Sequence, residues 1–311
     1  MENKTQFLIV ILLLLLGAPA ALSGCSVAYD GELSGGLDVL NEKSFPISEG
    51  KTLRITTSPG DVMVTPWDKN EVYVKVLGND KAREKMKFGF TGDDEEVVVT
   101  GKYERKFFNW GNSGIKLRYE VKAPANFNVK VSTSGGDIRV GGITGMVNLK
   151  TSGGDVEIRE TRGELEISTS GGDIKLENPE GRTKASTSGG DIKVENFKGN
   201  LITTTSGGDI KLNGGNGSIQ AKTSGGDIKL NYSGSNEGIE LATSGGDIDI
   251  IVPYDFKASV KLSSSGGDVD CGFTTDNVKT EGKRKLEADI NGGGKMVIAK
   301  TSGGEINLNK K

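Results

Sequence analysis

The residues best suited to chemistry in this chain are carboxylates that recur at a regular interval. The pentapeptide Thr-Ser-Gly-Gly-Asp, or a close variant of it, occurs nine times, and its carboxylates are spaced by 18 residues five times, then by 20, 21 and 37. They belong to Asp137, Asp155, Asp173, Asp191, Asp209, Asp227, Asp247, Asp268 and Glu305. Oxygen ligands of this kind suit calcium, and short acidic side chains also cap turns by accepting backbone N–H groups.

The spacing of the carboxylates favours turn capping over calcium binding. The calcium-binding motif of secreted toxins has the pattern Gly-Gly-x-Gly-x-Asp and repeats at about nine residues, whereas this chain has one carboxylate per 18 residues and lacks the second glycine pair. We therefore expect each Asp to bind backbone N–H groups of its turn, and we expect no metal or cofactor. Lysines two residues further on would relieve repulsion within the column, at Lys175, Lys193, Lys211 and Lys229. Calcium binding is the alternative.

The composition excludes several classes of function. The 311 residues include no His, which removes Ser-His-Asp triads, Cys-His dyads and histidine-bearing zinc sites. The 39 basic residues are balanced by 42 acidic ones, so nothing in the charge favours nucleic acid as a partner. A carbohydrate-active enzyme with paired carboxylates is a remote alternative, but such sites gather unlike residues in one groove, and these acids occupy equivalent positions. We predict no catalytic residues and no enzymatic activity.

The residues around each carboxylate alternate between apolar and polar types. Apolar residues stand one and three positions after the Asp, as Ile174 and Leu176 do, and six and eight positions before it, as Ile167 and Leu165 do. A period of two is typical of strands with one buried face. The alternation changes phase across the Gly-Gly pair, so the chain bends there, and glycine reaches backbone angles that are closed to other residues.

A second turn is marked by glycine ten residues before the Asp, at Gly145, Gly163, Gly181, Gly199 and Gly217. Two short strands and two Gly-rich turns in an approximately 18-residue unit form one rung of an all-β fold, a β-solenoid similar to a parallel β-helix. We expect identical motifs to stack directly above one another, about 4.8 Å apart. A stack of antiparallel hairpins would alternate in the same way and is the rival arrangement.

The two turns differ in how uniform they are. A Thr or Ser four residues before each carboxylate has the inward parity, and we expect its hydroxyl to bond along the stack, at Thr133, Thr151, Thr169, Thr187, Thr205, Thr223, Thr243, Ser264 and Thr301. The longer spacings all fall at the second turn, where insertions are tolerated. Specific binding contacts are therefore expected on this variable edge. Cys271 occupies an inward position and is expected to be a small buried hydrophobic residue.

The N-terminus has the features of an exported, lipid-anchored protein. An apolar run of ten residues, Phe7 to Leu16, is too short to span a bilayer and fits a secretory signal core. The residues Leu22-Ser23-Gly24-Cys25 resemble the lipobox of bacterial lipoproteins, in which the Cys becomes the first mature residue and is lipidated. This resemblance implies a lipoprotein signal peptide over residues 1–24, lipidation of Cys25 and a lipidated tether over 25–50. A plain signal peptide with an incidental Cys25 is the alternative.

Residues 51–311 are assigned to one solenoid domain, with irregular rungs at 51–130 and regular repeats at 131–311. Ser58-Pro59-Gly60-Asp61 is a divergent first copy of the repeat, and Asp80 to Met86 is expected to form a short helical turn. The segment Pro124-Ala-Asn-Phe127 is echoed by Pro253-Tyr-Asp-Phe256, which indicates two elaborated rungs within one continuous domain.

Together with these lead-in segments, the Ser-Gly-Gly-Asp-Ile repeats resemble the bacterial putative-adhesin β-strand repeat family, which is related to the head domains of adhesins. The resemblance covers about residues 50–311. It implies an envelope-exposed β-solenoid without catalytic residues and, for some relatives, a genetic link to envelope stress responses.

Two other segments are candidate surfaces. Lys102 to Trp110 concentrates aromatic and basic residues, and it could contact a glycan, a lipid headgroup or a protein, or cover an open end of the solenoid. The acidic cluster Asp93 to Glu96 is expected to be a solvated hairpin tip.

The predicted function is that of a lipid-anchored cell-envelope protein whose non-catalytic solenoid is displayed for adhesion or for binding an envelope protein or glycan. Its membrane contact would be the lipid on Cys25, and because Ser26 follows this Cys, the outer membrane or cell surface is favoured over retention at the cytoplasmic membrane. The alternative is a regulatory or scaffold protein for envelope stress or membrane signalling that has no external ligand.

Overall fold

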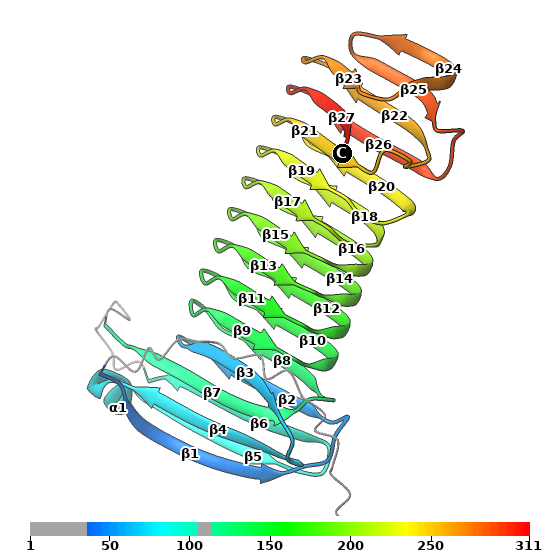
Figure 1. Cartoon of the computed structure of the whole chain (residues 1–311). Coiled ribbons are helices and arrows are strands. Elements are labelled where there is room, and N and C mark those ends of the chain that lie inside the picture. The colour runs from blue at the N-terminus through cyan, green and yellow to red at the C-terminus, as the bar shows by residue number, and fades with distance from the viewer. Residues whose placement is uncertain (1–35, 105–113) are drawn as a thin grey trace, which may run out of the picture.

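The computed structural model describes residues 36–104 and 114–311 and shows a rod made of two facing β-sheets (Figure 1). The chain passes from one sheet to the other in each rung. The first sheet contains, in spatial order, β1 (Asp38–Pro46), β4 (Glu71–Gly78), β7 (Leu117–Pro124), β3 (Asp61–Trp67), β9 (Ile138–Gly141), β11 (Val156–Arg159), β13 (Ile174–Glu177), β15 (Ile192–Glu195), β17 (Ile210–Asn213), β19 (Ile228–Asn231), β21 (Ile248–Val252), β27 (Ile306–Lys310) and β23 (Val269–Cys271).

The second sheet contains, in spatial order, β24 (Thr275–Gly282), β25 (Lys285–Ile290), β22 (Ala258–Ser264), β26 (Met296–Thr301), β20 (Asn236–Ala242), β18 (Gly217–Lys222), β16 (Lys198–Thr204), β14 (Glu180–Ser186), β12 (Arg162–Ser168), β10 (Thr144–Lys150), β8 (Asn128–Ser132), β2 (Thr52–Thr57), β6 (Glu96–Tyr103) and β5 (Met86–Gly92). The single helix of the described residues, α1 (Asp80–Lys85), confirms the predicted helical turn.

The regular rungs are parallel and in register. Ile174 of β13 pairs with Ile192 of β15, and Leu165 of β12 pairs with Thr183 of β14, so each position lies beside its equivalent 18 residues away. The predicted β-solenoid with two strands and two turns per rung is confirmed, and the antiparallel hairpin stack is wrong for this region. The register follows from the sequence pattern, because a shift by one residue would turn every apolar side chain out of the core.

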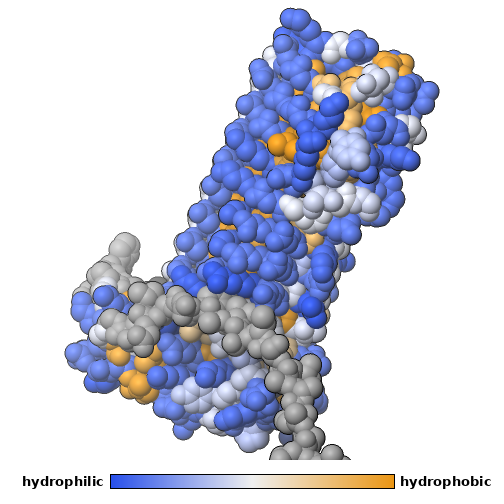
Figure 2. All heavy atoms as spheres, viewed as in Figure 1, coloured by the Kyte–Doolittle hydropathy of each residue, from blue (hydrophilic) through white to orange (hydrophobic). Residues whose placement is uncertain are grey.

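The core lies between the two sheets and consists of the apolar residues on both sides of each Gly-Gly pair. Ile167, Leu176 and Ile192, for example, have no more than 1% of their surface exposed. Full burial of such a side chain contributes about 1.5–3 kcal/mol. The viewed outer face of the regular rungs is mostly hydrophilic (Figure 2), as expected for strands with one buried face.

At both ends, the spatial order of the rungs departs from the order along the chain. β2 and β3 lie between the β6–β7 rung and the β8–β9 rung, although they precede both in sequence. β26 and β27, which follow all other strands in sequence, lie between the β20–β21 rung and the β22–β23 rung. The expectation that repeats stack in chain order is therefore wrong at both ends.

The two Pro-x-x-Phe segments mark the crossovers that skip a rung. Pro124 ends β7 and Phe127 precedes β8, while Pro253 and Phe256 lie between β21 and β22. Both Phe side chains are buried, and the Phe256 ring packs at 6.0 Å from the ring of Tyr232. The buried ring adds apolar contacts at the point where the chain leaves the regular turn.

Antiparallel strands cover both ends of the stack. β1, β4 and β5 do so at the N-terminal end, and the β24–β25 hairpin extends the second sheet at the other end. β1 lies within the stretch expected to be a tether, so the folded body begins before residue 50. It escaped the sequence pattern because it is an edge strand with weak alternation of buried and exposed residues.

The acidic cluster is the tip of the β5–β6 hairpin, as predicted. The Asp93 carboxylate accepts the backbone N–H groups of Glu95 and Glu96, each at 2.8 Å, and these bonds lower the pKa of Asp93. Cys271 is only partly buried, contrary to the prediction, because β23 is the last strand of its sheet. Its partial burial raises the pKa of the thiol. Among the residues described, no helix is long and apolar enough to cross a membrane.

Candidate functional site

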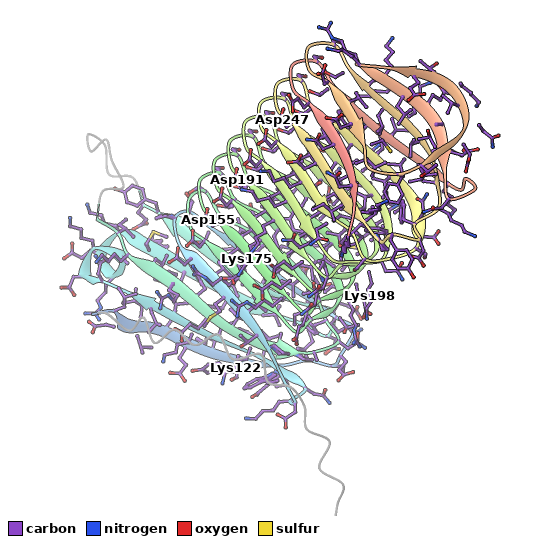
Figure 3. The ribbon with its side chains drawn as sticks, turned by 45° about the horizontal axis from the view of Figure 1, so that its top comes forward. Lys122, Asp155, Lys175, Asp191, Lys198 and Asp247 are labelled. Carbon is purple, nitrogen blue, oxygen red and sulfur yellow. The ribbon has the colours of Figure 1, made fainter. Side chains whose placement is uncertain are left out.

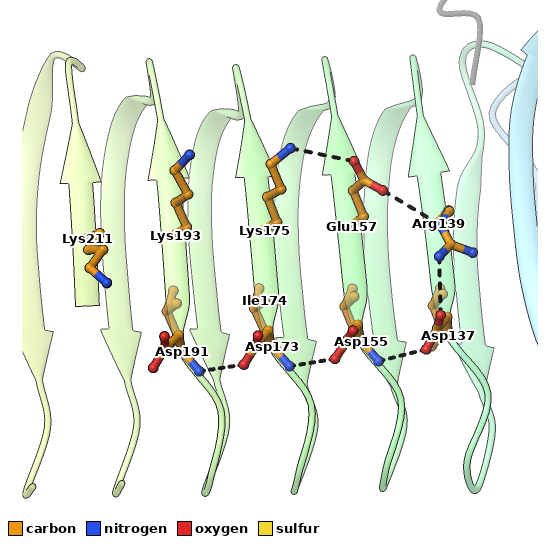
Figure 4. Close-up of a pocket in the computed structure, with 13 residues that line it drawn as sticks. Asp137, Arg139, Asp155, Glu157, Asp173, Ile174, Lys175, Asp191, Lys193 and Lys211 are labelled. Atoms are coloured by element: carbon orange, nitrogen blue, oxygen red, sulfur yellow. Dashed lines mark hydrogen bonds and ion pairs between the residues drawn. The ribbon is translucent and has the colours of Figure 1, made fainter. Parts of the chain in front are cut away.

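The Gly-Gly-Asp edge carries a continuous hydrogen-bond ladder of carboxylates. In each rung, Oδ1 accepts the backbone N–H of the equivalent residue in the next rung, over distances of 2.8–3.1 Å. The ladder runs from Asp61 to Asp247, whose Oδ1 accepts the N–H of Glu305. Figure 3 shows Asp155, Asp191 and Asp247 in one row, and Figure 4 shows bonds between adjacent rungs. The prediction that Asp binds backbone N–H groups is confirmed, but the donor belongs to the neighbouring rung.

Lysines two residues after the carboxylates form ion pairs either with the preceding Asp or with a Glu that follows. Lys211 Nζ lies 3.3 Å from Asp209 Oδ2, as predicted, but Lys175 Nζ lies 2.5 Å from Glu177 Oε1. The hydrogen bond from Lys175 is the main reason why the pKa of Glu177 is lowered. The pKa of Asp209 is lowered chiefly because its carboxylate accepts the N–H of Asp227. The column is thus stabilised first by backbone donors and only locally by lysine.

The Thr column forms a second ladder behind the carboxylates. Each Thr hydroxyl donates to a glycine carbonyl in the neighbouring rung at 2.9–3.0 Å, and Ser264 does the same to Gly304 at 2.7 Å. Most of these hydroxyls also accept the N–H of the second glycine in their own turn. The predicted bonding along the stack is confirmed.

The second glycine of each pair is required by close packing and not by its backbone angle. A Cβ on Gly172 would overlap with the carbonyl oxygen of Gly154, whereas a Cβ on Gly171 would have its nearest neighbour, the Ser152 carbonyl oxygen, at 3.7 Å. Neither Gly171 nor Gly172 has a φ in the left-handed region. The expectation that unusual backbone angles explain these glycines is therefore wrong, because the distance between rungs is what excludes a side chain.

A shallow groove of about 470 Å³ follows this edge (Figure 4). Its charged lining residues are of both signs and include Asp137, Arg139, Asp155, Glu157, Asp173, Lys175, Asp191, Lys193 and Lys211. One oxygen of each ladder carboxylate is already bonded to a backbone N–H of the next rung, so the carboxylates that line this groove have a structural role. Within residues 36–104 and 114–311, no group of three or more Cys, Asp or Glu is placed to hold a metal ion.

Carboxyl pKa values in this protein suit ion pairing and not proton transfer. All described carboxyl groups with a shifted pKa are shifted downward, by hydrogen bonds or ion pairs, at Asp93, Glu177, Glu180, Asp209, Glu240 and Asp289. A general acid for glycoside cleavage needs a raised pKa. None of the carboxyl groups with a shifted pKa in residues 36–104 and 114–311 meets this requirement.

The second-turn edge holds a larger groove whose lining differs from rung to rung. Its volume is about 580 Å³, and its polar lining residues include Thr144, Glu160, Arg162, Asn178, Glu180, Asn196 and Lys198. Glu180 pairs with Lys198 at 2.8 Å and with Arg162 at 2.7 Å, and the bond from Lys198 is the main cause of its lowered pKa. Asn178 and Asn196 both have a φ of 53°, a conformation that Asn tolerates better than most residues.

An aromatic pair lies at the N-terminal end of the second-turn edge. Trp67 ends β3 and directly follows Pro66, which lines the second-turn groove. The Trp67 ring centroid lies 6.0 Å from that of Tyr73, and Lys69 Nζ and Lys122 Nζ lie 4.9 and 5.8 Å from it. This cluster was not predicted from the sequence. The available signal was one of only two tryptophans, placed at the end of a strand that carries the repeat pattern.

Two predicted sites fall outside the described residues. Cys25 and the signal peptide over residues 1–24 precede residue 36. The aromatic and basic segment Lys102 to Trp110 is described only up to residue 104. Their predicted roles stay predictions.

Several solved structures are similar to this chain. A putative adhesin from Bacteroides fragilis has 12% sequence identity and a TM-score of 0.44, over 86% of this chain and 96% of that chain. A putative cell adhesion protein from Clostridium sporogenes has 11% identity and a TM-score of 0.24, over 87% and 99%. A putative lipid binding protein from Parabacteroides distasonis has 16% identity and a TM-score of 0.40, over 87% and 96%.

A comparison with curated proteins finds no match. The model of one protein family, Toastrack DUF4097, matches residues 50–309, which covers nearly all of the described solenoid. The chain belongs to the Toastrack DUF4097 family.

Proposed function

We propose that this protein is a lipid-anchored rod of the bacterial cell envelope that displays its second-turn edge for adhesion or ligand binding and catalyses no reaction. The observation that carries this proposal is the contrast between the two edges. One edge repeats the same side-chain ladder through the regular rungs, which suits a rigid support, while the other presents a groove with different side chains in successive rungs.

The anchor in this proposal is a lipid on Cys25. Eleven positions separate Cys25 from Gly36, where the described body begins. Even a fully extended chain spans at most about 3.6 Å per residue, so the N-terminal end of the rod would stay within about 40 Å of the bilayer. The remaining rungs would then project away from the anchored end, and the second-turn groove would be accessible along the side of the rod.

The proposal is tested by protease accessibility on intact cells of the source bacterium. The native protein is compared with Cys25→Ala, which removes the lipid acceptor. We expect the native rod to be digested on whole cells, and we expect the variant to be released or mislocalised.

Protection of the native protein until the envelope is breached would overturn display at the cell surface. It would favour the alternative role, a regulatory or scaffold protein without an external ligand. Unchanged membrane retention of Cys25→Ala would overturn the lipid anchor.

A further inference from the structure

We propose that Trp67, Tyr73, Lys69 and Lys122 form a binding subsite for an acidic sugar, at the N-terminal end of the second-turn groove. This proposal rests on the proposed binding function and gives it a ligand class. The four residues are called the Trp67 cluster below.

The rings of the Trp67 cluster are held in fixed orientations by bonds at their polar atoms. Trp67 Nε1 donates to the backbone oxygen of Glu71 at 2.8 Å, and the Tyr73 hydroxyl donates to Glu42 Oε1 at 2.7 Å. The second bond is the main reason why the pKa of Tyr73 is raised to about 12. Because both polar atoms are already bonded, the two partly exposed rings can contact a ligand through their carbon surfaces, and a ligand on Trp67 would share that ring with the Nζ atoms of Lys69 and Lys122. Fixed rings also lose little conformational entropy on binding.

The two lysines place positive charge beside the Trp67 ring, whereas the negative charges of Glu42 and Glu120 act on Tyr73. Lys122 projects from β7, at the wide N-terminal end of the rod (Figure 3), and among the described residues it has no carboxylate within 4 Å. Lys69 has only a distant partner, Glu71 Oε1 at 3.8 Å. An ammonium group carries three donors, so both lysines keep donors for a ligand while they lie near the Trp67 ring.

This combination identifies the chemistry of the ligand. A pyranose ring has an apolar C–H face that can stack on an indole ring, and a carboxylate on the same ring could accept hydrogen bonds from Lys69 and Lys122. A neutral sugar would use the rings but not the charges, and a small anion would use the charges but not the rings. A uronic acid residue uses both.

The groove next to the cluster provides room for further sugar units. Pro66 precedes Trp67 and lines the second-turn groove, and it packs so closely on Gly142 of the next rung that a Cβ there would lie 2.7 Å from Pro66 Cγ. From that point the groove continues past Arg162 and Lys198. Both side chains pair with Glu180, but each carries further donors that a ligand could use. We therefore expect a linear acidic oligosaccharide to bind with one unit at Trp67 and the others along the second-turn edge.

The test is a fluorescence titration of the purified full-length chain in detergent. Trp110→Phe leaves Trp67 as the only tryptophan, so a change in emission reports directly on the cluster. The probe is a trisaccharide of galacturonic acid, with the neutral galactose trisaccharide as the matched ligand. We expect the acidic trisaccharide to change Trp67 emission and to bind more weakly as salt is added, and we expect the neutral one to bind at least about tenfold more weakly.

Variants separate the contributions of charge and ring. Lys122→Gln should reduce the affinity for the acidic trisaccharide about tenfold and leave that for the neutral one unchanged. Lys150→Gln, an exposed lysine on the second sheet, is the control and should change neither affinity. The contribution of the ring is tested by measuring the affinity of Trp67→Phe and Trp67→Ala for the trisaccharide by calorimetry, with circular dichroism to verify folding. Phe keeps part of the stacking surface, and Ala removes it.

Equal affinity for both trisaccharides, or no emission change with either, would overturn the proposal. So would Trp67-dependent binding to vesicles of anionic phospholipid without binding of the trisaccharide. Failure of the binding site can be told apart from failure of the proposed function. The titration uses purified protein and does not depend on where the chain resides in the cell, whereas the protease experiment does not depend on Trp67.

Discussion

The two edges of the solenoid solve the same problem, a reversal of the chain in every rung, in different ways. The Gly-Gly-Asp edge joins neighbouring rungs through side chains in addition to backbone bonds, with Asp bonded to the next N–H and Thr bonded to a neighbouring glycine carbonyl. The second-turn edge joins them through the backbone, as when the N–H of Lys198 donates to the carbonyl of Pro179 at 2.9 Å. Only the second arrangement leaves the side chains free to differ.

This difference explains why one edge is uniform in sequence and the other is not. In a side-chain ladder, each rung must supply the side chain that bonds to the next rung, so each rung needs the same residues. At the other positions of the second turn, a backbone ladder needs compatible φ and ψ angles, which Glu160, Asn178 and Asn196 provide with φ values of 50–53°. The exception is the glycine column of this turn, because a Cβ on Gly163 or Gly181 would overlap with a carbonyl oxygen of the neighbouring rung. Substitutions should therefore be costly at the first edge and, outside the glycine column, mild at the second.

The strongest test of this comparison is Gly172→Ala. The new Cβ would overlap with the carbonyl oxygen of Gly154, so two rungs would have to move apart, and we expect the free energy of unfolding to fall by at least about 3 kcal/mol. Gly171→Ala is the matched control. Its Cβ would have 3.7 Å of space, and stability should stay within about 1 kcal/mol of native. Urea unfolding followed by circular dichroism measures both, and equal losses would contradict close packing as the reason for the second glycine.

A smaller effect is expected from two Thr to Val exchanges in one rung. Thr205 donates to the carbonyl of Gly190 at 2.9 Å, so Thr205→Val should lower the free energy of unfolding by about 1–2 kcal/mol. Thr203 is fully buried, and its hydroxyl has no hydrogen-bond partner in the described part of the chain. Thr203→Val should therefore raise stability, by about 1 kcal/mol. The same urea experiment decides, and the prediction is wrong if both variants change stability in the same direction.

The carboxylate ladder predicts a loss of stability in acid. Because the folded state lowers the pKa of Asp209 below the ordinary value of 3.8, its contribution is fully present above that value and is lost as the pH falls through the lowered pKa. Asp209→Asn keeps an acceptor for the Asp227 N–H but cannot titrate. The difference in melting temperature between native and variant protein should be constant from pH 7 to about pH 5 and should shrink below pH 3.8. A difference that grows in acid would contradict the ladder.

The smallest effect is expected at the second-turn edge. Lys198→Ala removes the 2.8 Å pair with Glu180, but the lysine side chain is 68% exposed, so solvent screens the pair and the urea midpoint should stay within experimental error of native. Arg162→Ala, which removes the other partner of Glu180, should have the same effect. A clear fall of the urea midpoint in either variant would show that the variable edge also supports the stack.

The sequence was sufficient to predict the rung, because the rung is a local property. The parity of residues such as Ile167 and Leu176 determines which side chains face the core, and the column of Thr predicts the hydroxyl ladder. The order of the rungs at the ends was not predictable in the same way. β26 and β27 carry the same repeat pattern as their neighbours, so nothing in the pattern indicates that they lie between the β20–β21 rung and the β22–β23 rung. The only local signs are the Pro-x-x-Phe crossovers.

The Trp67 cluster could not be predicted from the sequence for a related reason. Trp67 and Tyr73 are close in sequence, but Lys122 joins them only because β7 lies between β3 and β4 in the first sheet. That neighbour relation follows from the intercalated rung and not from the repeat. In contrast, the general expectation that specific contacts belong on the second-turn edge needed only the positions of the insertions.

The intercalated rung also changes how the rod can unravel. In a simple linear array, the outermost repeat ends in a loose chain and frays first. Here the outermost rung, β22–β23, is held at both of its ends, since residues 253–257 join it to β21 and residues 291–295 join the following hairpin to β26. If that rung detaches, it becomes a closed loop and gains less conformational entropy than a free chain end would. The last rung is thus held by chain connections on both sides. We expect backbone amides in β22 and β23 to exchange their hydrogens more slowly than those of a terminal repeat that ends in a free chain.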